Sequence, residues 1–220
     1  MSEYSDEFYG KYQSGAQLSA QVVVPMILDL VSPRSALDVG CGTGSWLAEF
    51  RERGVEDICG LDGAWVPLDR LQIPLDRFGP VDLAAPGTLP RRFDVALCLE
   101  VAEHVDEAGA KGLIEFLTAA SSVVVFSAAV PGQGGTGHVN EQWLDYWQEI
   151  FTTFGYRLFD PIRAQVWDNP SVEPWYAQNL VVFADQRAEP ALLDRLTIAH
   201  ELNTIRVNAI HPGMRTAVYG

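Results

Sequence analysis

A short segment rich in carboxylates and imidazole is the part of this chain best suited to acid–base or metal chemistry. It reads Leu99-Glu100-Val101-Ala102-Glu103-His104-Val105, and a further histidine opens the later segment His138-Val139-Asn140-Glu141. An imidazole near its ordinary pKa can accept a proton from a hydroxyl or an amine, and a nearby carboxylate can assist it. His104, His138 and Glu103 are therefore candidate catalytic residues.

The same residue types also suit a divalent metal ion. Glu100 and Glu103 lie three residues apart and Glu100 and His104 lie four apart, so they share one face if the segment is helical. His138 could complete the set from a neighbouring loop. Two carboxylates and two imidazoles suit magnesium, manganese or zinc. A structural interpretation also stays open, in which Glu100 binds the amino end of a cofactor and His104 caps a helix.

A glycine-rich run near the N-terminus predicts a cofactor-binding loop. In Leu37-Asp38-Val39-Gly40-Cys41-Gly42-Thr43-Gly44, an apolar strand breaks into alternating glycines and opens a helix. Glycines allow the backbone to approach a ligand closely, and the first N–H groups of a helix attract negative charge. A dinucleotide-binding turn would need a glycine at the sixth position from Gly40, where the chain has Ser45.

The pattern acidic-x-Gly-x-Gly-x-Gly resembles the first motif of class I S-adenosylmethionine (SAM)-dependent methyltransferases. Asp62, in Gly60-Leu61-Asp62-Gly63, has the position of an acid that accepts both hydroxyls of a ribose. Val81-Asp82-Leu83 resembles the third-strand motif of that family, whose acid meets the adenine amino group, and Arg92-Phe93-Asp94 resembles its fourth strand. The resemblance implies SAM as cofactor, bound by Asp38, Gly40, Cys41, Gly42, Gly44, Asp62, Gly63, Asp82, Leu83 and Glu100.

The Glu-x-x-Glu-His element, with the distant His138, resembles the metal-binding set of small-RNA 2′-O-methyltransferases of the Hen1 type. Similar elements occur in the quinone-pathway O-methyltransferases. In such chemistry the metal would hold a vicinal diol or a catechol-like pair and lower the pKa of the attacked hydroxyl. The resemblance therefore implies O-methylation, with Glu100, Glu103, His104 and His138 as candidate metal ligands.

The charge of the chain bears on the acceptor. The formal net charge is −14 and the chain contains two lysines, Lys11 and Lys111. Because nucleic-acid affinity depends largely on Lys and Arg, this balance disfavours an RNA substrate. We expect a small-molecule acceptor, a sugar or a secondary metabolite. A Hen1-type RNA methyltransferase and a non-catalytic SAM-binding regulatory module remain as alternatives.

Alternating strand-like and helical patterns predict an α/β fold with a parallel sheet. The resemblance implies a Rossmann-like seven-stranded methyltransferase sheet of order 3-2-1-4-5-7-6, with strand 7 antiparallel and helices on both faces. Helices are predicted from Gln17 to Val31, from Gly44 to Arg53, after an Asp106 cap, and from an Asn140 cap to Gly155. Strands are predicted over residues 36–39, 58–61, 81–83, 94–99, 123–127 and 179–184.

Three regions are expected in the chain. Residues 1–33 form a helical cap or lid, residues 34–186 form the SAM-binding domain, and residues 187–220 form a helical extension. The glycine-rich residues 131–137 are expected to act as a substrate loop. Five aromatic residues are expected near the acceptor pocket, where they could form its walls or equally fill the core, namely Trp143, Tyr146, Trp167, Trp175 and Tyr176.

Length and composition limit the remaining possibilities. The 220 residues suit one sizeable domain. No apolar stretch approaches the roughly 20 residues of a membrane span, and the N-terminus is acidic. Cys41, Cys59 and Cys98 show no metal-ligand spacing and are expected to be free thiols. We expect a cytoplasmic protein without membrane contact, either a monomer or a homodimer.

Overall fold

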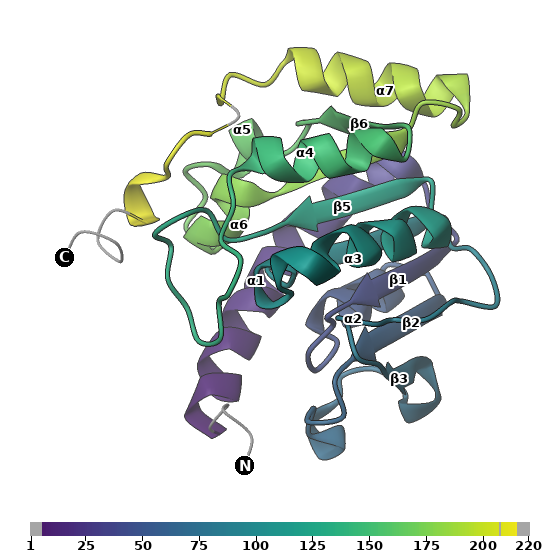
Figure 1. The fold of residues 1–220 in the computed structure, drawn as a ribbon, viewed down its shortest axis with the longest axis vertical. Helices are drawn as coiled ribbons and strands as arrows, with labels where there is room; N and C mark the ends of the chain where they lie inside the picture. The colour runs from purple at the N-terminus through teal and green to yellow at the C-terminus, as the bar shows by residue number, and fades with distance from the viewer. Residues whose placement is uncertain (1–5, 207, 215–220) are drawn as a thin grey trace.

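The computed structural model describes residues 6–206 and 208–214, with side chains from Ser14 onward, and a mixed sheet lies at its centre (Figure 1). Within this part the sheet has seven strands in the order β3-β2-β1-β4-β5-β7-β6. The neighbouring strands are parallel except in the two pairs that contain β7. The predicted order and the antiparallel seventh strand are confirmed. The strands are β1 (Ser35–Val39), β2 (Asp57–Asp62), β3 (Phe78–Pro80), β4 (Val95–Leu99), β5 (Val123–Ser127), β6 (Tyr156–Phe159) and β7 (Val181–Asp185).

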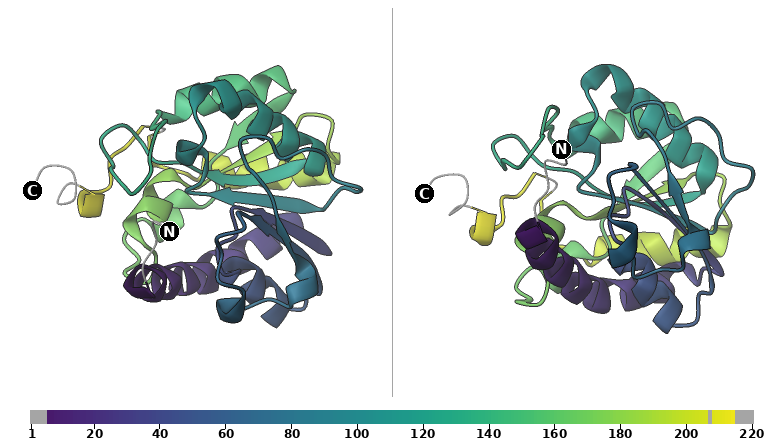
Figure 2. Two further views of the ribbon diagram at one scale, coloured as in Figure 1. Left: turned by 60° about the horizontal axis from the view of Figure 1, so that its bottom comes forward. Right: turned by 90° about the horizontal axis from the view of Figure 1, so that it is seen from below.

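Helices cover both faces of the sheet, as predicted (Figures 1 and 2). Two buried clusters, one on each face, show which helices pack where. One face carries α3 (Glu107–Ala120) and α4 (Leu144–Thr153). The other carries α1 (Asp6–Val31), α2 (Ser45–Glu52), α5 (Arg163–Val166), α6 (Pro174–Asn179) and α7 (Pro190–Glu201).

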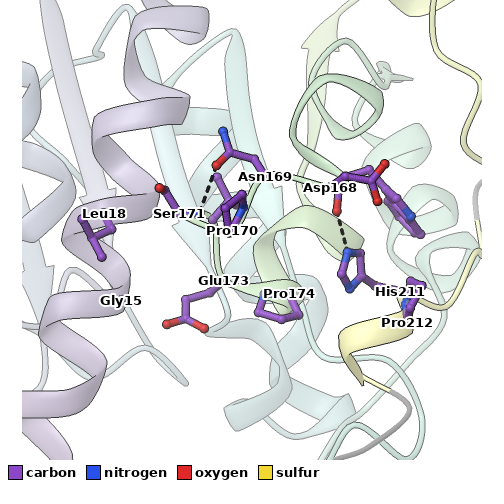
Figure 3. Close-up of a pocket in the computed structure, with 12 residues that line it drawn as sticks. Gly15, Leu18, Asp168, Asn169, Pro170, Ser171, Glu173, Pro174, His211 and Pro212 are labelled. Atoms are coloured by element: carbon purple, nitrogen blue, oxygen red, sulfur yellow. Dashed lines mark hydrogen bonds between the residues drawn. The ribbon is translucent and has the colours of Figure 1, made fainter.

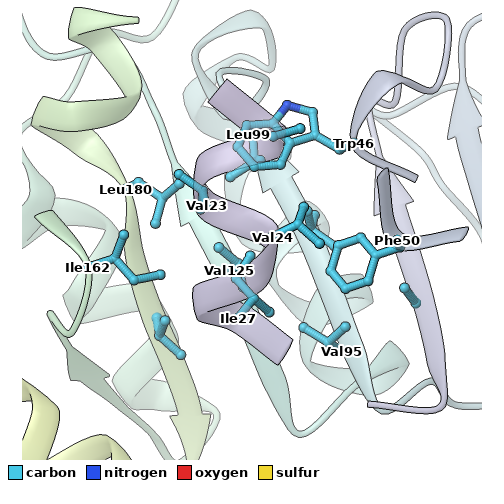
Figure 4. Close-up of a cluster of buried hydrophobic side chains, with 14 of the residues drawn as sticks. Val23, Val24, Ile27, Trp46, Phe50, Val95, Leu99, Val125, Ile162 and Leu180 are labelled. Atoms are coloured by element: carbon cyan, nitrogen blue, oxygen red, sulfur yellow. The ribbon is translucent and has the colours of Figure 1, made fainter. Parts of the chain in front are cut away.

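The central strands are apolar on both faces because each face is covered. In β4, Val95, Leu97 and Leu99 pack on the α1 side, whereas Ala96 and Cys98 pack on the α3 side. This alternation follows from the two-residue period of a strand, and it explains why β4 is a continuous apolar run in the sequence. The core between the sheet and the α1 layer includes side chains of α1, α2, β4 and β5 (Figure 4).

Helix α1 is a core helix of this domain. Its window Ser14–Val31 is long and apolar enough to cross a membrane, by length and composition alone. The expectation that no apolar stretch approaches the length of a membrane span was therefore wrong for this helix. However, Val23, Val24 and Ile27 are almost completely buried against the sheet and α2. The apolar face of α1 is therefore used for packing. The expected lid role of residues 1–33 stays a prediction, and residues 1–5 lie outside the described part.

Several predicted boundaries were wrong. Helix α1 begins at Asp6 and not at Gln17, and strand β6 was not predicted. The third strand is Phe78–Pro80 and not residues 81–83, because its partner β2 ends at Asp62, the residue that pairs with Pro80 and whose carbonyl accepts from Val81 N. Helix α4 starts at Leu144 and not after an Asn140 cap. Asn140 is instead buried, and its N–H donates to Glu103 O. By contrast, Asp106 caps α3 as predicted, since its side chain accepts from Gly109 N.

Candidate active site

The glycine loop joins β1 to α2 at the carboxyl edge of the sheet. Gly40, Gly42 and Gly44 all have positive φ angles, of 83°, 54° and 87°. A Cβ on Gly40 would overlap the Val101 side chain, whereas a Cβ on Gly42 would meet nothing within 4 Å. Gly40 therefore serves close packing inside the protein, and Gly42 leaves open space beside the loop. This space is where a cofactor can approach the backbone.

Asp62 at the end of β2 is bonded to this loop. Its Oδ2 accepts from Gly42 N at 2.7 Å and its Oδ1 accepts from Gly63 N at 2.6 Å. Burial raises the pKa of Asp62, and these two bonds offset part of that effect. A carboxylate oxygen can accept more than one hydrogen bond, so Asp62 can also accept from ribose hydroxyls.

The other predicted cofactor residues lie around the same edge. Asp38 is buried, and burial followed by repulsion from Asp62 raises its pKa to about 8. Cys41 is buried and burial raises the pKa of its thiol. Asp82 is exposed and its Oδ1 accepts from Ala84 N, while Leu83 is half-buried beside it. The adjacent Val81 N donates to Asp62 O at 2.8 Å, which brings this segment to the end of β2.

Trp65 is a feature of this edge that was missed. It is 56% exposed, and a Cβ on Gly63 would overlap its ring. An exposed indole packed on the residue after Asp62 offers a flat apolar surface beside the loop. The signal in the sequence was an aromatic residue three positions after the strand-end acid.

Glu100 leaves β4 with strained backbone. Its φ is 55°, a value that non-glycine residues rarely adopt, and its N–H donates to Ser127 O and Oγ. The carboxylate accepts from Gln133 Nε2 at 2.6 Å and from Asn179 Nδ2 at 3.1 Å. Burial raises the pKa of Glu100 to about 7, although these amides act in the opposite direction. Gln133 and Asn179 were not identified from the sequence, because they come from other segments.

Glu103, His104 and His138 form a compact group. Their potential ligand atoms all lie within 4.8 Å of one another. The rings of His104 and His138 are nearly perpendicular, with centroids 4.9 Å apart, and His138 Nε2 is 3.9 Å from Glu103 Oε1. The one-turn helix Ala102–His104 and the loop before α4 bring the three together. Three of the four predicted metal ligands therefore share one place, and Glu100 is not in this group.

Glu103 is the least ordinary member of the group. The residue is fully buried, and neither carboxylate oxygen has a hydrogen-bond partner among the described residues. Burial, and then repulsion from Glu100, raises the pKa of Glu103 well above the usual range of a glutamate, although nearby backbone amides act to lower it. Buried carboxylates are normally paired or bound to a metal, so this arrangement favours a ligand that is positively charged or able to donate.

Glu141 orders the loop that carries His138. Its Oε1 accepts from Gly134 N at 2.7 Å and lies 2.9 Å from His138 Nδ1, while its Oε2 accepts from Gly132 N at 2.8 Å. Burial alone would raise the pKa of Glu141, but the bonds to His138, Gly132 and Gly134 outweigh it and the pKa is lowered. The glycine-rich segment is therefore tied to Glu141, which no sequence motif had indicated.

A cavity of about 340 Å³ lies beside this group. Trp175 and Tyr176 line it as predicted, and the glycine-rich loop contributes Gly134, Gly135 and Thr136. Trp167 lies in a neighbouring cavity, and neither Trp143 nor Tyr146 is among the described residues that line the two. The remaining lining residues are Leu99, Glu100, Glu103, His104, Gln133, His138, Pro174, Gly213 and Met214.

Comparison with known proteins agrees with this fold. Residues 12–159 match the family model described as "Methyltransferase domain". This match covers more than half of the chain, so the chain belongs to this family and is a class I SAM-dependent methyltransferase. No curated protein matches the chain.

Solved structures share the fold at low sequence identity. The methyltransferase domain of a bacterial Hen1 is 20% identical with a TM-score of 0.58, over 77% of this chain and 98% of that one. CalS10, an amino pentose methyltransferase from Micromonospora echinaspora, is 17% identical with a TM-score of 0.63, over 84% and 98% of the two chains. DesVI from Streptomyces venezuelae is 16% identical with a TM-score of 0.58, over 82% and 96%.

Proposed function

We propose that this protein transfers the methyl group of SAM to a hydroxyl group of a small molecule, a sugar or a secondary metabolite, with the assistance of a metal ion. One observation carries the proposal. Glu103, His104 and His138 converge beside a cavity of about 340 Å³ that opens next to the carboxyl end of β4. In an open α/β sheet, ligands bind beyond the carboxyl ends of the strands, where the glycine loop also lies.

The glycine-loop edge fits the cofactor. SAM supplies an activated methyl group on a sulfonium, so its transfer is an in-line displacement that needs alignment more than acid catalysis. Gly42 leaves room at the loop, and Asp62 can accept from ribose hydroxyls. In the proposal, Asp38, Gly40, Cys41, Gly44 and Gly63 shape this edge, and Asp82 with Leu83 meets the adenine. The bonds of Glu100 to Gln133 and Asn179 favour its role at the cofactor over metal ligation.

Methylation of a hydroxyl group releases one proton, which a base or water near the acceptor must take up. When the acceptor oxygen takes the methyl group, its hydroxyl proton must leave, and S-adenosylhomocysteine is the other product. Without a metal, His138 would take that proton at Nε2, because its Nδ1 faces Glu141 Oε1. With a metal bound at Nε2 that lone pair would be used, and the proton would leave to water. His104 lies beside His138 and can serve the same purpose. Both are half-buried or exposed, so the proton can pass on to water.

The Glu103 group fits a divalent metal ion. Neither oxygen of the buried Glu103 carboxylate has a hydrogen-bond partner among the described residues, and the ligand atoms of Glu103 and the two imidazoles lie within 4.8 Å of one another. Such a metal would lower the pKa of a hydroxyl bound to it. Glu141 holds His138 from the far side, as the outer carboxylate does in many metal-bound histidines. Magnesium, manganese and zinc all suit these ligand types.

The charge of the protein supports a small acceptor. The net charge is −14, which opposes binding to the RNA backbone. The fold likeness to the Hen1 domain is the observation that keeps an RNA acceptor as the alternative. The likeness to CalS10, whose name describes an amino pentose methyltransferase, favours a sugar-sized acceptor. The open cavity argues against a module that only binds SAM. We also propose a cytoplasmic monomer or homodimer.

The first test is calorimetric titration of chelator-treated protein with S-adenosylhomocysteine, before and after addition of Mg²⁺, Mn²⁺ or Zn²⁺. We expect cofactor binding without metal, and separate metal binding that both His104→Ala and His138→Ala abolish. Methyl transfer from labelled SAM to catechol, sugar diols and a short RNA then identifies the acceptor class. Absence of cofactor binding would contradict the enzyme proposal. Cofactor binding without any metal response would replace metal assistance with acid–base catalysis by the histidines.

A further inference from the structure

The segment His211–Met214, which we call the partition, contributes to the walls of two cavities. The first is the acceptor cavity, which Gly213 and Met214 line. The second, of about 350 Å³, lies between α1 and residues 167–174, and His211 and Pro212 line it (Figure 3). Pro174 lines both.

His211 holds this partition through three contacts. Its backbone N–H donates to Gln178 Oε1 at 2.8 Å. Gly213 N donates to its Nδ1 at 3.0 Å, and its Nε2 lies 2.6 Å from Trp167 O. Because Nδ1 accepts, Nε2 must carry the proton and donate to Trp167 O, so the neutral ring in one tautomer satisfies both bonds. The indole of Trp167 packs on the same imidazole, with ring centroids 4.8 Å apart.

The contacts of His211 place the Met214 side chain in the wall of the acceptor cavity. Met214 is 5% exposed although it lies close to the end of the described chain. Gly213, the residue before Met214, approaches Pro174 so closely that a Cβ on Gly213 would lie 2.9 Å from the Cγ of Pro174. The segment lies outside residues 12–159, which match the family model. A part of the chain beyond the family match therefore completes the wall of the cavity.

We propose that Met214 determines acceptor specificity by limiting the size of the acceptor cavity, and that His211 is the residue that positions it. This inference rests on the proposed function of the cavity. A shorter side chain at position 214 enlarges the acceptor cavity. A larger side chain fills it. Glu100 lines this cavity, but among the described residues neither the glycine loop nor Asp62 lines it, so the effect should fall mainly on the acceptor and little on SAM.

The position of Met214 can be measured without any acceptor. The chain has three methionines, Met1, Met26 and Met214, so methionine methyl-¹³C NMR gives few signals. Met214→Leu assigns the signal of interest. We expect the chemical shift of the Met214 methyl group to differ from that of free methionine. In His211→Ala it should move toward the free-methionine value, while the chemical shift of Met26 stays unchanged. Leu202→Ala is the matched control, because Leu202 is 76% exposed in the same extension.

The effect on specificity is measured by methyl transfer to catechols with substituents of increasing size. In Met214→Ala and His211→Ala, we expect the ratio of kcat/KM for a bulky catechol over catechol itself to rise about tenfold, as the removal of a few methylene groups from a pocket permits. The KM for SAM should stay within about twofold. In Met214→Phe the same ratio should fall.

Each result has a distinct meaning. A free-methionine signal for Met214 in the wild type would overturn the inference, and so would an unchanged ratio in all three variants. A docked Met214 signal in a protein that binds S-adenosylhomocysteine but methylates no acceptor would overturn the proposed function and the specificity role together. The partition itself would remain.

Discussion

The Nδ1 atom of His138 lies 2.9 Å from Oε1 of Glu141, three residues further along the chain. A carboxylate can only accept, so the neutral imidazole carries its proton on Nδ1 and presents the Nε2 lone pair to Glu103 and His104. The same carboxylate accepts from two glycine N–H groups of the loop. One side chain thus sets both the shape of the loop and the tautomer of the neutral histidine.

Replacement of Glu141 by glutamine should weaken metal binding about 10- to 100-fold, because an amide orients and polarises the imidazole less well than a carboxylate. Isothermal titration with Mn²⁺ measures the change. Glu149→Gln is the control, because Glu149 is exposed on α4. Equal metal affinity in the wild type and in Glu141→Gln would show that Glu141 does not act through His138.

Replacement of Glu103 by glutamine should raise stability and abolish metal binding. The pKa of Glu103 is raised well above its usual range, mainly by burial. The metal-free folded protein must therefore take up a proton or bury a charge at neutral pH, a cost that glutamine avoids. We expect a gain of roughly 1–3 kcal/mol at pH 8 in chelator, shrinking toward pH 4, where the carboxyl is neutral in both states.

Thermal melts at pH 5 and pH 8 measure this gain, with the exposed Glu115→Gln as the matched control. A loss of stability in Glu103→Gln at pH 8 would contradict the assignment of Glu103 as a residue kept at a cost to stability for ligand binding.

The free energy of unfolding should fall as the pH rises from about 4 to about 8. The pKa of Asp38 is about 8 in the folded protein because of burial and then repulsion from Asp62, and an unfolded aspartate titrates near 4. Between these values the folded state holds a proton that the unfolded state has lost, so stability decreases by about 1.4 kcal/mol per pH unit for one such group.

Urea denaturation at several pH values gives this slope. Asp38→Asn should reduce it by the contribution of one proton and leave that of Glu100, whose pKa of about 7 acts in the same direction. An identical slope in Asp38→Asn would show that Asp38 is already ionised at neutral pH in the folded protein.

Two glycine substitutions should distinguish a loss of cofactor affinity from a loss of protein stability. In Gly42→Ala the new Cβ meets no protein atom, so we expect a stability loss of about 1–2 kcal/mol from the positive φ, together with a large loss of affinity for S-adenosylhomocysteine. In Gly40→Ala the Cβ overlaps Val101, so the protein itself should be destabilised further. Melting curves and calorimetry on both variants test the contrast. Normal cofactor affinity in Gly42→Ala would place the cofactor elsewhere.

Much of the fold could be predicted because its signals are local. The apolar run of β4 and the turn after β1 are carried by neighbouring residues, and Asp106 caps α3 within one turn. The boundaries that were wrong depended on distant partners. Asn140 is a residue type that often caps helices, but its N–H bonds to Glu103 O, which is remote in sequence. Pro80 ends a strand that, within the described chain, pairs with β2 alone.

The sequence by itself determined the cofactor loop, the order of the acidic strand ends and the residue types available for catalysis, because periodicity and backbone preference act over a few residues. Only the tertiary structure decided that His104 and His138 meet at Glu103, that Glu100 instead bonds to Gln133 and Asn179, and that Met214 lines the cavity beside them. These relationships join segments far apart in the chain. Burial and hydrogen-bond geometry select them, and those quantities exist only once the chain has packed.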